Sequence, residues 1–315
     1  MNPLTIAHIS DLHLSTEHKR ANIKNTRRLL EFAIRRNVDH IVITGDIAAN
    51  AERRDFEMAR KIFQSYGLLD PLKLTLVIGN HDIYGGVQTA EDILTFPGRC
   101  KNTDYKEQVK EFRNVFHEAF ERCIFPDAPK PFPFAKVVGD VVLVGLNSIA
   151  RHSGVRNPLG SNGEVDKRQM QALEQILASG LLTGKRKIVL IHHHFSKMEL
   201  QAQGAIHGVW GAIERQTMKL RGKKLLLDLF AKTNVDLVLH GHLHESRVYM
   251  RKGIRFLNAG GSVLGSIPGE LSLNLVSIAG SKVDTTIHKL PGDIHSVHHM
   301  PLLPLKSVNP EHVAA

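Results

Sequence analysis

The sequence is poor in residues that form disulfides or span membranes. Only two of its 315 residues are cysteine, Cys100 and Cys123, and they lack the spacing of a zinc site, so we expect free thiols. No stretch approaches the roughly 20 apolar residues of a membrane span. The first ten residues lack the basic and long apolar regions of a signal peptide. These absences predict a soluble cytoplasmic protein without a transmembrane segment.

Aromatic residues are also scarce, at 6% of the chain. That content argues against a platform of stacked rings for single-stranded nucleic acid. The formal net charge of +10 nevertheless favours an anionic partner: a nucleotide, nucleic acid or an anionic membrane surface. Hydrophobic residues make up 42% of the sequence, which suffices to fill the core of one large domain or two smaller ones.

Apolar runs of strand length alternate with segments of helical periodicity. We predict strands at 4–9, 40–44, 73–78, 187–191, 235–239, 246–249 and 254–258, with hairpins at 136–146 and 271–288. We predict helices at 24–36, 51–66, 105–122, 165–178 and 223–231. This alternation is typical of an α/β fold whose site lies at the carboxyl ends of the strands.

Two segments depart from this alternation. Periodicity is weak over residues 85–135, which we interpret as an insertion or lid beside the site. Residues 291–315 contain prolines and histidines with little periodicity, and we expect a C-terminal extension or strap. The remaining residues 1–290 are predicted to form one domain, because no inter-domain linker is apparent.

Polar donors follow five of the predicted strands. They are Asp11 and His13, Asp46, Asn80 with His81 and Asp82, the run His192-His193-His194, and His242 and His244. Residues two apart in an extended chain point to the same side, so Asp11 and His13 can address one point. Gly45, Gly79 and Gly241 permit sharp turns and close approach beside them.

The donors combine carboxylate, amide and imidazole groups and contain no thiolate. This chemistry favours Mn, Fe or Zn over an all-oxygen Mg²⁺ or Ca²⁺ site. Even seven of these donors would exceed what one small ion with an open coordination position can use. Two ions that share a carboxylate would accommodate them.

Five blocks in this order resemble the signature of the calcineurin-like metallophosphoesterases. They are Asp11-x-His13, Gly45-Asp46, Gly79-Asn80-His81-Asp82, the later His192, and Gly241-His242-Leu243-His244, within residues 6–261. The resemblance implies a four-layer α/β/β/α sandwich of two mixed sheets, with a dinuclear metal site at the C-terminal ends of the strands. The layout is also similar to that of the bacterial cyclic-nucleotide phosphodiesterase group.

The resemblance also implies roles for single residues. Asp11, His13 and His244 would hold the first metal, Asn80, His192 and His242 the second, and Asp46 would bridge them. His81 would contact the phosphate and act as general acid, with Asp82 as its orienting partner. The implied reaction is phosphodiester hydrolysis of a small phosphorylated substrate by a hydroxide that the two metals share.

Several alternatives stay open at this point. His193 could replace His192 as ligand, because the prolines that often follow this histidine are absent; otherwise His193 could line the substrate pocket. The loop 147–163 offers Asn147 and Arg151 as substrate contacts. Other activities are pyrophosphate hydrolysis on a lipid-sugar nucleotide, nuclease activity, and a non-catalytic metal-binding scaffold. The basic stretch 215–224 could touch an anionic membrane, although a solvated helix face explains it as well.

Overall fold

The computed structural model describes residues 3–89, 91–126, 128–196, 218–265 and 267–293. Two mixed β-sheets form its centre. The first sheet contains β1 (Leu4–Ile9), β2 (His40–Thr44), β3 (Leu74–Val77), β13 (Glu270–Ala279) and β14 (Lys282–Pro291), in the order β14-β13-β1-β2-β3. β1, β2 and β3 are parallel, whereas β13 is antiparallel to both β1 and β14. The three parallel strands therefore end at one edge.

The second sheet has the order β11-β12-β10-β8-β6-β5-β4. Its strands are β4 (Cys123–Ile124), β5 (Phe134–Val138), β6 (Val141–Gly145), β8 (Arg186–Leu190), β10 (Leu237–His240), β11 (Arg247–Arg251) and β12 (Ile254–Asn258). β6, β8, β10 and β12 are parallel, and the outer strands are antiparallel to their neighbours. A short pair, β7 (Gly163–Glu164) with β9 (Leu220–Arg221), stands apart.

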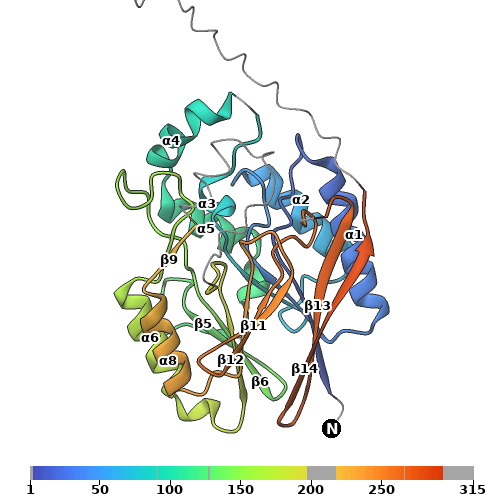
Figure 1. The fold of residues 1–315 in the computed structure, drawn as a ribbon, viewed down its shortest axis with the longest axis vertical. Helices are drawn as coiled ribbons and strands as arrows, with labels where there is room; N and C mark the ends of the chain where they lie inside the picture. Colours follow the sequence, from blue (N-terminus) through green and yellow to red (C-terminus); the bar gives the residue numbers. More distant parts are fainter. Residues whose placement is uncertain (1–2, 90, 127, 197–217, 266, 294–315) are drawn as a thin grey trace, which may run out of the picture.

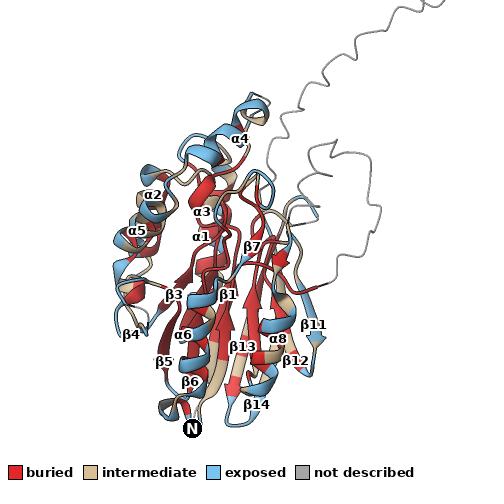
Figure 2. Ribbon diagram, turned by 90° about the vertical axis from the view of Figure 1, so that its left-hand side faces the viewer, coloured by how far each residue is buried: buried red, intermediate tan, exposed pale blue. Residues whose placement is uncertain are grey.

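Helices cover the outer faces of both sheets (Figure 1). The first sheet is flanked by α1 (Arg20–Arg35), α2 (Arg53–Ser65) and α5 (Tyr105–Val115), and the second by α6 (Lys167–Ala178) and α8 (Lys223–Lys232). Figure 2 shows buried strands between helices whose outer sides are exposed. The predicted α/β/β/α sandwich of two mixed sheets is confirmed. None of the helices in the described segments is long and apolar enough to cross a membrane.

The alternation of side chains along the strands divides the core. In β6, Val141 and Leu143 face the main core shared with the first sheet, whereas Val142 and Val144 pack in a second core with α6 and α8. Successive residues of a strand point to opposite faces, so a strand covered on both sides is apolar throughout. This explains why the central strands appear in the sequence as continuous apolar runs.

Part of the predicted insertion 85–135 packs into the main core. α5 and the 3₁₀ helix η1 (His117–Phe120) replace the single helix expected at 105–122, and Phe112 and Phe116 are fully buried. The Phe112 ring lies 5.8 Å from that of Phe56 on α2. α4 (Asp92–Asn102) was missed because Pro97 lies inside it, a residue that normally ends a helix. The expected strap at 291–315 lies almost entirely outside the described residues.

Candidate metal centre

The carboxyl ends of five parallel strands meet where the two sheets come together. β1, β2 and β3 are neighbours in the first sheet, and β8 and β10 are neighbours in the second. Two hydrogen bonds join the sheets at this edge: His192 Nδ1 donates to the carbonyl of Thr44 at 2.8 Å, and the His242 amide donates to the Asp11 carboxylate at 3.1 Å. The predicted donors are therefore assembled at one location.

A first group of donors consists of Asp11, His13 and His244. The Nε2 atoms of His13 and His244 are 3.3 Å apart, and His244 Nε2 lies 3.7 Å from Asp11 Oδ1. His13 Nε2 lies 4.0 Å from the same oxygen. One ligand atom from each residue falls within 4.8 Å of the others, which is close enough for all three to bind one ion.

A second group consists of Asn80, His192 and His242. His192 Nε2 is 3.0 Å from Asn80 Oδ1 and 3.1 Å from His242 Nδ1. All three side chains are buried, and those of His192 and His242 are at most 2% exposed. This group also satisfies the distances expected of ligands around one cation.

Asp46 lies between the two groups. Its Oδ1 atom is 3.5 Å from His192 Nε2, and its Oδ2 atom is 3.9 Å from His13 Nε2. The carboxylate is also held by the backbone amide of His81, which donates to Oδ1 at 2.8 Å. One oxygen thus faces each group, which is the arrangement a bridging ligand needs.

The hydrogen-bond chemistry of the second group fits a cation. A carbonyl oxygen only accepts, so the proton of a neutral His192 ring must be on Nδ1, where it bonds to Thr44. Nε2 then points a lone pair toward the Asn80 oxygen and the Asp46 carboxylate, which are also acceptors. Acceptors that face one another need a proton or a metal ion between them.

The pKa values of the buried groups are consistent with a cation between these side chains. Burial would raise the pKa of Asp46, but the neighbouring His192 and His81 hold it well below its usual range. Burial opposes protonation of His192, yet the Asp46 charge raises the pKa of His192 to about 9. Burial lowers the pKa of His13 and His242 well below the usual value, so both offer neutral lone pairs. A cation binding here would displace the proton of His192.

The backbone of the ligand segments was not predicted. Asp11, His13, Asp46 and His242 all have positive φ, between 43° and 73°. The backbone at Asp11 and His13 is therefore not extended. The expectation that an extended chain brings these two side chains together is wrong. Left-handed conformations of non-glycine residues cost roughly 1–3 kcal/mol each and cluster at functional sites. Four such residues among the seven candidate ligands therefore support this edge as the candidate site.

Glycine is required at two of the turns by close approach. A Cβ atom on Gly79 would lie 2.2 Å from the backbone nitrogen of Asp46. A Cβ atom on Gly241 would lie 2.4 Å from Asp11 Oδ2. Both positions are in contact with candidate ligands, so a larger residue would displace a carboxylate.

His81 lies beside Asp46 and is partly exposed, and Asp82 does not orient it. The His81 Nε2 atom is 3.9 Å from Asp46 Oδ2, and its Nδ1 atom lies 3.2 Å from the carbonyl of Ala49. The fully buried Asp82 instead accepts the backbone amides of Ala48 and Gly79, each at 2.9 Å. Asp82 therefore stabilises the turn. The His81 ring is positioned by the backbone carbonyl of Ala49, a contact that a sequence motif does not reveal.

His193 and Asn147 are also corrected from substrate contacts to structural residues. Both ring nitrogens of His193 are occupied, by Ser148 Oγ at 2.8 Å and the Ser161 carbonyl at 3.1 Å. The Asn147 side chain donates to Tyr105 and accepts the Ile149 amide. Of the two histidines considered as ligand, it is His192 that faces the donors. Arg151 is exposed and lines a cavity whose lining includes none of the candidate metal ligands.

This difference between neighbouring histidines predicts distinct defects. His192→Gln should lose one of two bound metal ions, or weaken its binding by at least about 100-fold, since even outer ligand contacts are worth 10–100-fold. His193→Gln should retain both metals and lower the melting temperature, because it breaks buried hydrogen bonds. Metal analysis by plasma mass spectrometry and thermal unfolding would measure both effects. Loss of metal in the His193 variant alone would reverse the assignment.

Two sheets whose strand ends carry two adjacent groups of imidazole, carboxylate and amide donors define an α/β sandwich protein with residue clusters that could hold metal ions. Comparison with family models gives a match to the calcineurin-like phosphoesterases over residues 4–246. The chain belongs to this family, whose members are phosphoester hydrolases that bind two divalent metal ions.

Solved structures show the same fold at low sequence identity. A dimetal phosphatase from Danio rerio is 12% identical, with a TM-score of 0.58 over 93% of this chain and 100% of that one. A purple acid phosphatase from yellow lupin seeds is 11% identical, with a TM-score of 0.53 over 93% of this chain and 52% of that one. A search of curated proteins gave no match.

Proposed function

We propose that the chain is a cytoplasmic phosphodiesterase with a dinuclear metal centre. Asp11, His13 and His244 would hold one cation and Asn80, His192 and His242 the other, while Asp46 contacts both. Mn, Fe and Zn suit this donor set, because it mixes imidazole with oxygen and contains no thiolate. When bound, a pair of such cations lowers the pKa of a water molecule and neutralises charge on phosphate oxygens.

The observation that carries the proposal is the placement of His81. Its ring is 16% exposed, and Nε2 lies 3.9 Å from the carboxylate that faces both donor groups. A diester releases an alkoxide, which needs a proton as the bond breaks, and imidazole is the commonest donor. Because Nδ1 lies against the Ala49 carbonyl, the proton that leaves must be on Nε2. His81 would thus donate in its doubly protonated form.

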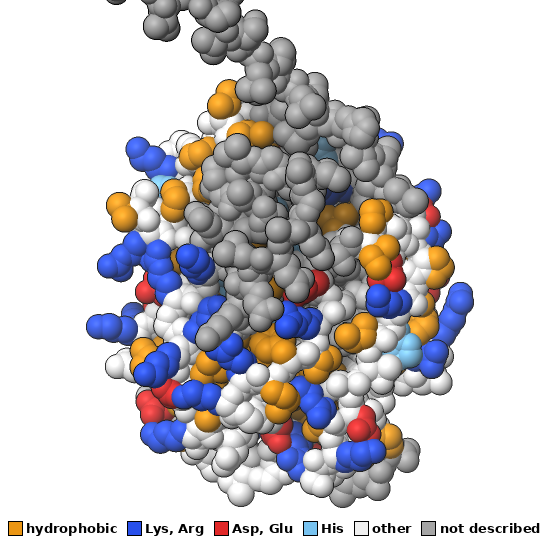
Figure 3. All heavy atoms as spheres, in the orientation of Figure 1, with side chains coloured by type: hydrophobic (Ala, Val, Ile, Leu, Met, Phe, Trp, Pro, Cys, Tyr) orange, Lys and Arg blue, Asp and Glu red, His pale blue; other side chains and the backbone are white. Residues whose placement is uncertain are grey.

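The described side chains on the face drawn in Figure 3 support a small substrate over a long nucleic acid. Figure 3 shows lysine and arginine side chains spread over the visible face and interspersed with acidic and apolar groups. A polyanion is usually bound by a continuous basic stripe. The basic stretch 215–224, considered above for membrane contact, is only partly described, and its residues 215–217 lie outside the described segments.

The proposal predicts a preference for diesters. With Mn²⁺, kcat/KM for bis-p-nitrophenyl phosphate should exceed that for p-nitrophenyl phosphate by at least about tenfold, a difference of roughly 1.4 kcal/mol in transition-state binding. A chelator should abolish turnover and added Mn²⁺ should restore it. Faster hydrolysis of the monoester would contradict the diesterase proposal. Metal-loaded protein that hydrolyses neither compound would be a scaffold.

A further inference from the structure

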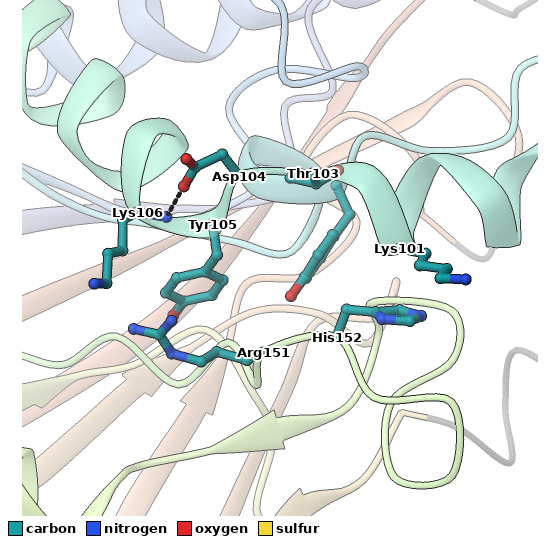
Figure 4. Close-up of a pocket in the computed structure, with 8 residues that line it drawn as sticks. Lys101, Thr103, Asp104, Tyr105, Lys106, Arg151 and His152 are labelled. Carbon is teal, nitrogen blue, oxygen red and sulfur yellow. Dashed lines mark hydrogen bonds between the residues drawn. The ribbon is translucent and has the colours of Figure 1, made fainter.

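A cavity is lined in part by Tyr84, three residues after His81. It has a volume of about 380 Å³, within the range of small-ligand pockets, and is formed by the end of α3 (His81–Tyr84), the junction of α4 with α5, and the loop after β6. The lining residues that matter below are Tyr84, Lys101, Tyr105, Lys106, Arg151 and His152. In Figure 4, Arg151 and Lys106 lie on one side of the cavity, and His152 and Lys101 on the other.

Two tyrosines in the cavity lining are hydrogen-bonded to the loop after β6. Tyr84 donates its hydroxyl to the Ala150 carbonyl at 2.9 Å, and Tyr105 donates to the Ile149 carbonyl at 2.8 Å. Their rings are 6.4 Å apart. The next residue along the loop is Arg151, so two hydrogen bonds hold the backbone directly before it. A site anchored in this way loses little conformational freedom when a ligand binds.

The cavity carries an excess of positive charge. Lys101, Lys106 and Arg151 form no ion pair with any described residue. The one carboxylate on the wall, Asp104, already accepts the backbone amides of Lys106 and Glu107 as the N-cap of α5. The Arg151 guanidinium lies 5.0 Å from the centre of the Tyr105 ring, which orients it without neutralising it. The missing counter-charge points to an anionic ligand.

Two chain segments connect the cavity lining to the candidate metal centre. Tyr84 ends the short helix that begins at His81. The Arg151 loop passes through Ser148, which bonds to His193, and the His193 ring lies 4.3 Å from that of His242. Helix α3 and the loop after β6 therefore contribute to both the cavity wall and the surroundings of the candidate ligands.

We propose that this cavity binds a second phosphate group of the substrate, so that the enzyme prefers phosphodiesters carrying an additional phosphate. Lys101, Lys106 and Arg151 would contact the phosphate oxygens, since charge-assisted hydrogen bonds are the strongest that a protein offers such a group. The inference rests on the phosphodiesterase function proposed above, and it adds the class of diester. Part of the binding should weaken with salt because the three side chains are accessible.

Two substrates that differ in one group test the proposal. The p-nitrophenyl ester of thymidine 5′-phosphate has only the scissile phosphate, whereas its 3′-phosphorylated analogue has a second one. The wild-type enzyme should show kcat/KM about tenfold or more higher for the analogue, a difference expected from one or two charged hydrogen bonds. Equal values would overturn the subsite while leaving the phosphodiesterase function intact.

Variants connect the preference to the cavity. Arg151→Gln and Lys101→Gln should each reduce the ratio between the two substrates about three- to tenfold and leave hydrolysis of the simpler ester unchanged. Lys110→Gln is the matched control, because Lys110 lies on α5 outside the cavity lining and pairs with Glu107. A ratio that stays at the wild-type value in the Arg151 and Lys101 variants would overturn the proposal.

If neither ester is hydrolysed, calorimetric titration with inorganic pyrophosphate tests whether the cavity binds phosphate. The intact protein should bind pyrophosphate about tenfold more tightly than the Arg151→Gln/Lys101→Gln double variant. Equal affinity would exclude the subsite on grounds independent of catalysis. Weaker binding in the double variant would support it even if the proposed activity failed.

Discussion

Replacing Asp46 with asparagine should nearly abolish hydrolysis and reduce the metal content below two ions per chain. The carboxylate turns one oxygen toward His192 and the other toward His13, so it is the single described residue placed between both donor groups. Asparagine keeps the shape but offers one oxygen and no charge. Losing about 4 kcal/mol of electrostatic stabilisation corresponds to a rate loss of roughly 10³-fold.

The experiment combines steady-state kinetics with metal analysis of the same preparation. Asp236→Asn is a suitable control, because Asp236 pairs with Arg186 at the opposite end of the strands. It should retain both metal ions and the wild-type rate. An Asp46→Asn enzyme with two bound ions and full turnover would show that the carboxylate does not bridge. Unfolding followed by circular dichroism distinguishes a local defect from loss of the fold.

Much of the fold could be predicted because the central strands are apolar throughout. β2 is buried at every position and is followed directly by Gly45 and Asp46, so the end of the apolar run locates the ligand. The same logic places Asn80 after β3 and His192 after β8. Parallel neighbours bring these ends together, which the alternation of strands and helices implies.

The local conformation at the strand ends could not be predicted in the same way. Whether Asp82 faces His81 or the amides of Ala48 and Gly79 depends on a turn that sequence periodicity does not describe. The positive φ of Asp11 is stabilised by tertiary contacts, such as the hydrogen bond that its backbone amide donates to the Gly45 carbonyl at 3.1 Å. The backbone carbonyls of Thr44 and Ala49 orient the rings of His192 and His81, and a sequence motif does not reveal such contacts.

The residues that line the cavity were harder to predict from the sequence than the candidate metal ligands. Arg151 was considered because it follows a strand of the second sheet, and the structure places it on a cavity wall with Lys101 and Lys106. Those two lysines lie in the segment whose periodicity is weak, and they approach Arg151 only because α4 and α5 fold back beside α3. Long-range packing of this kind is set by the core around Phe112 and Phe116, and not by local sequence.

Replacing His81 with alanine should lower the turnover of diesters by roughly 10²-fold or more while both metal ions stay bound. In the structure its ring lies beside the candidate ligands, and its own backbone amide, which the substitution retains, holds Asp46. Metal analysis should therefore give the wild-type content. His117→Ala, which changes an exposed histidine on η1, should have no effect on rate or metal.

The size of the His81 effect should depend on the leaving group. A general acid matters most when the departing oxygen is strongly basic, so a phenyl ester of thymidine 5′-phosphate should suffer a larger loss than the p-nitrophenyl ester. A loss equal for both esters would point to phosphate binding without proton transfer. Loss of one metal ion would instead make His81 a ligand, which its distance of 3.9 Å from Asp46 Oδ2 also permits. Because leaving-group dependence and metal content are measured separately, each result assigns His81 to one of these three roles.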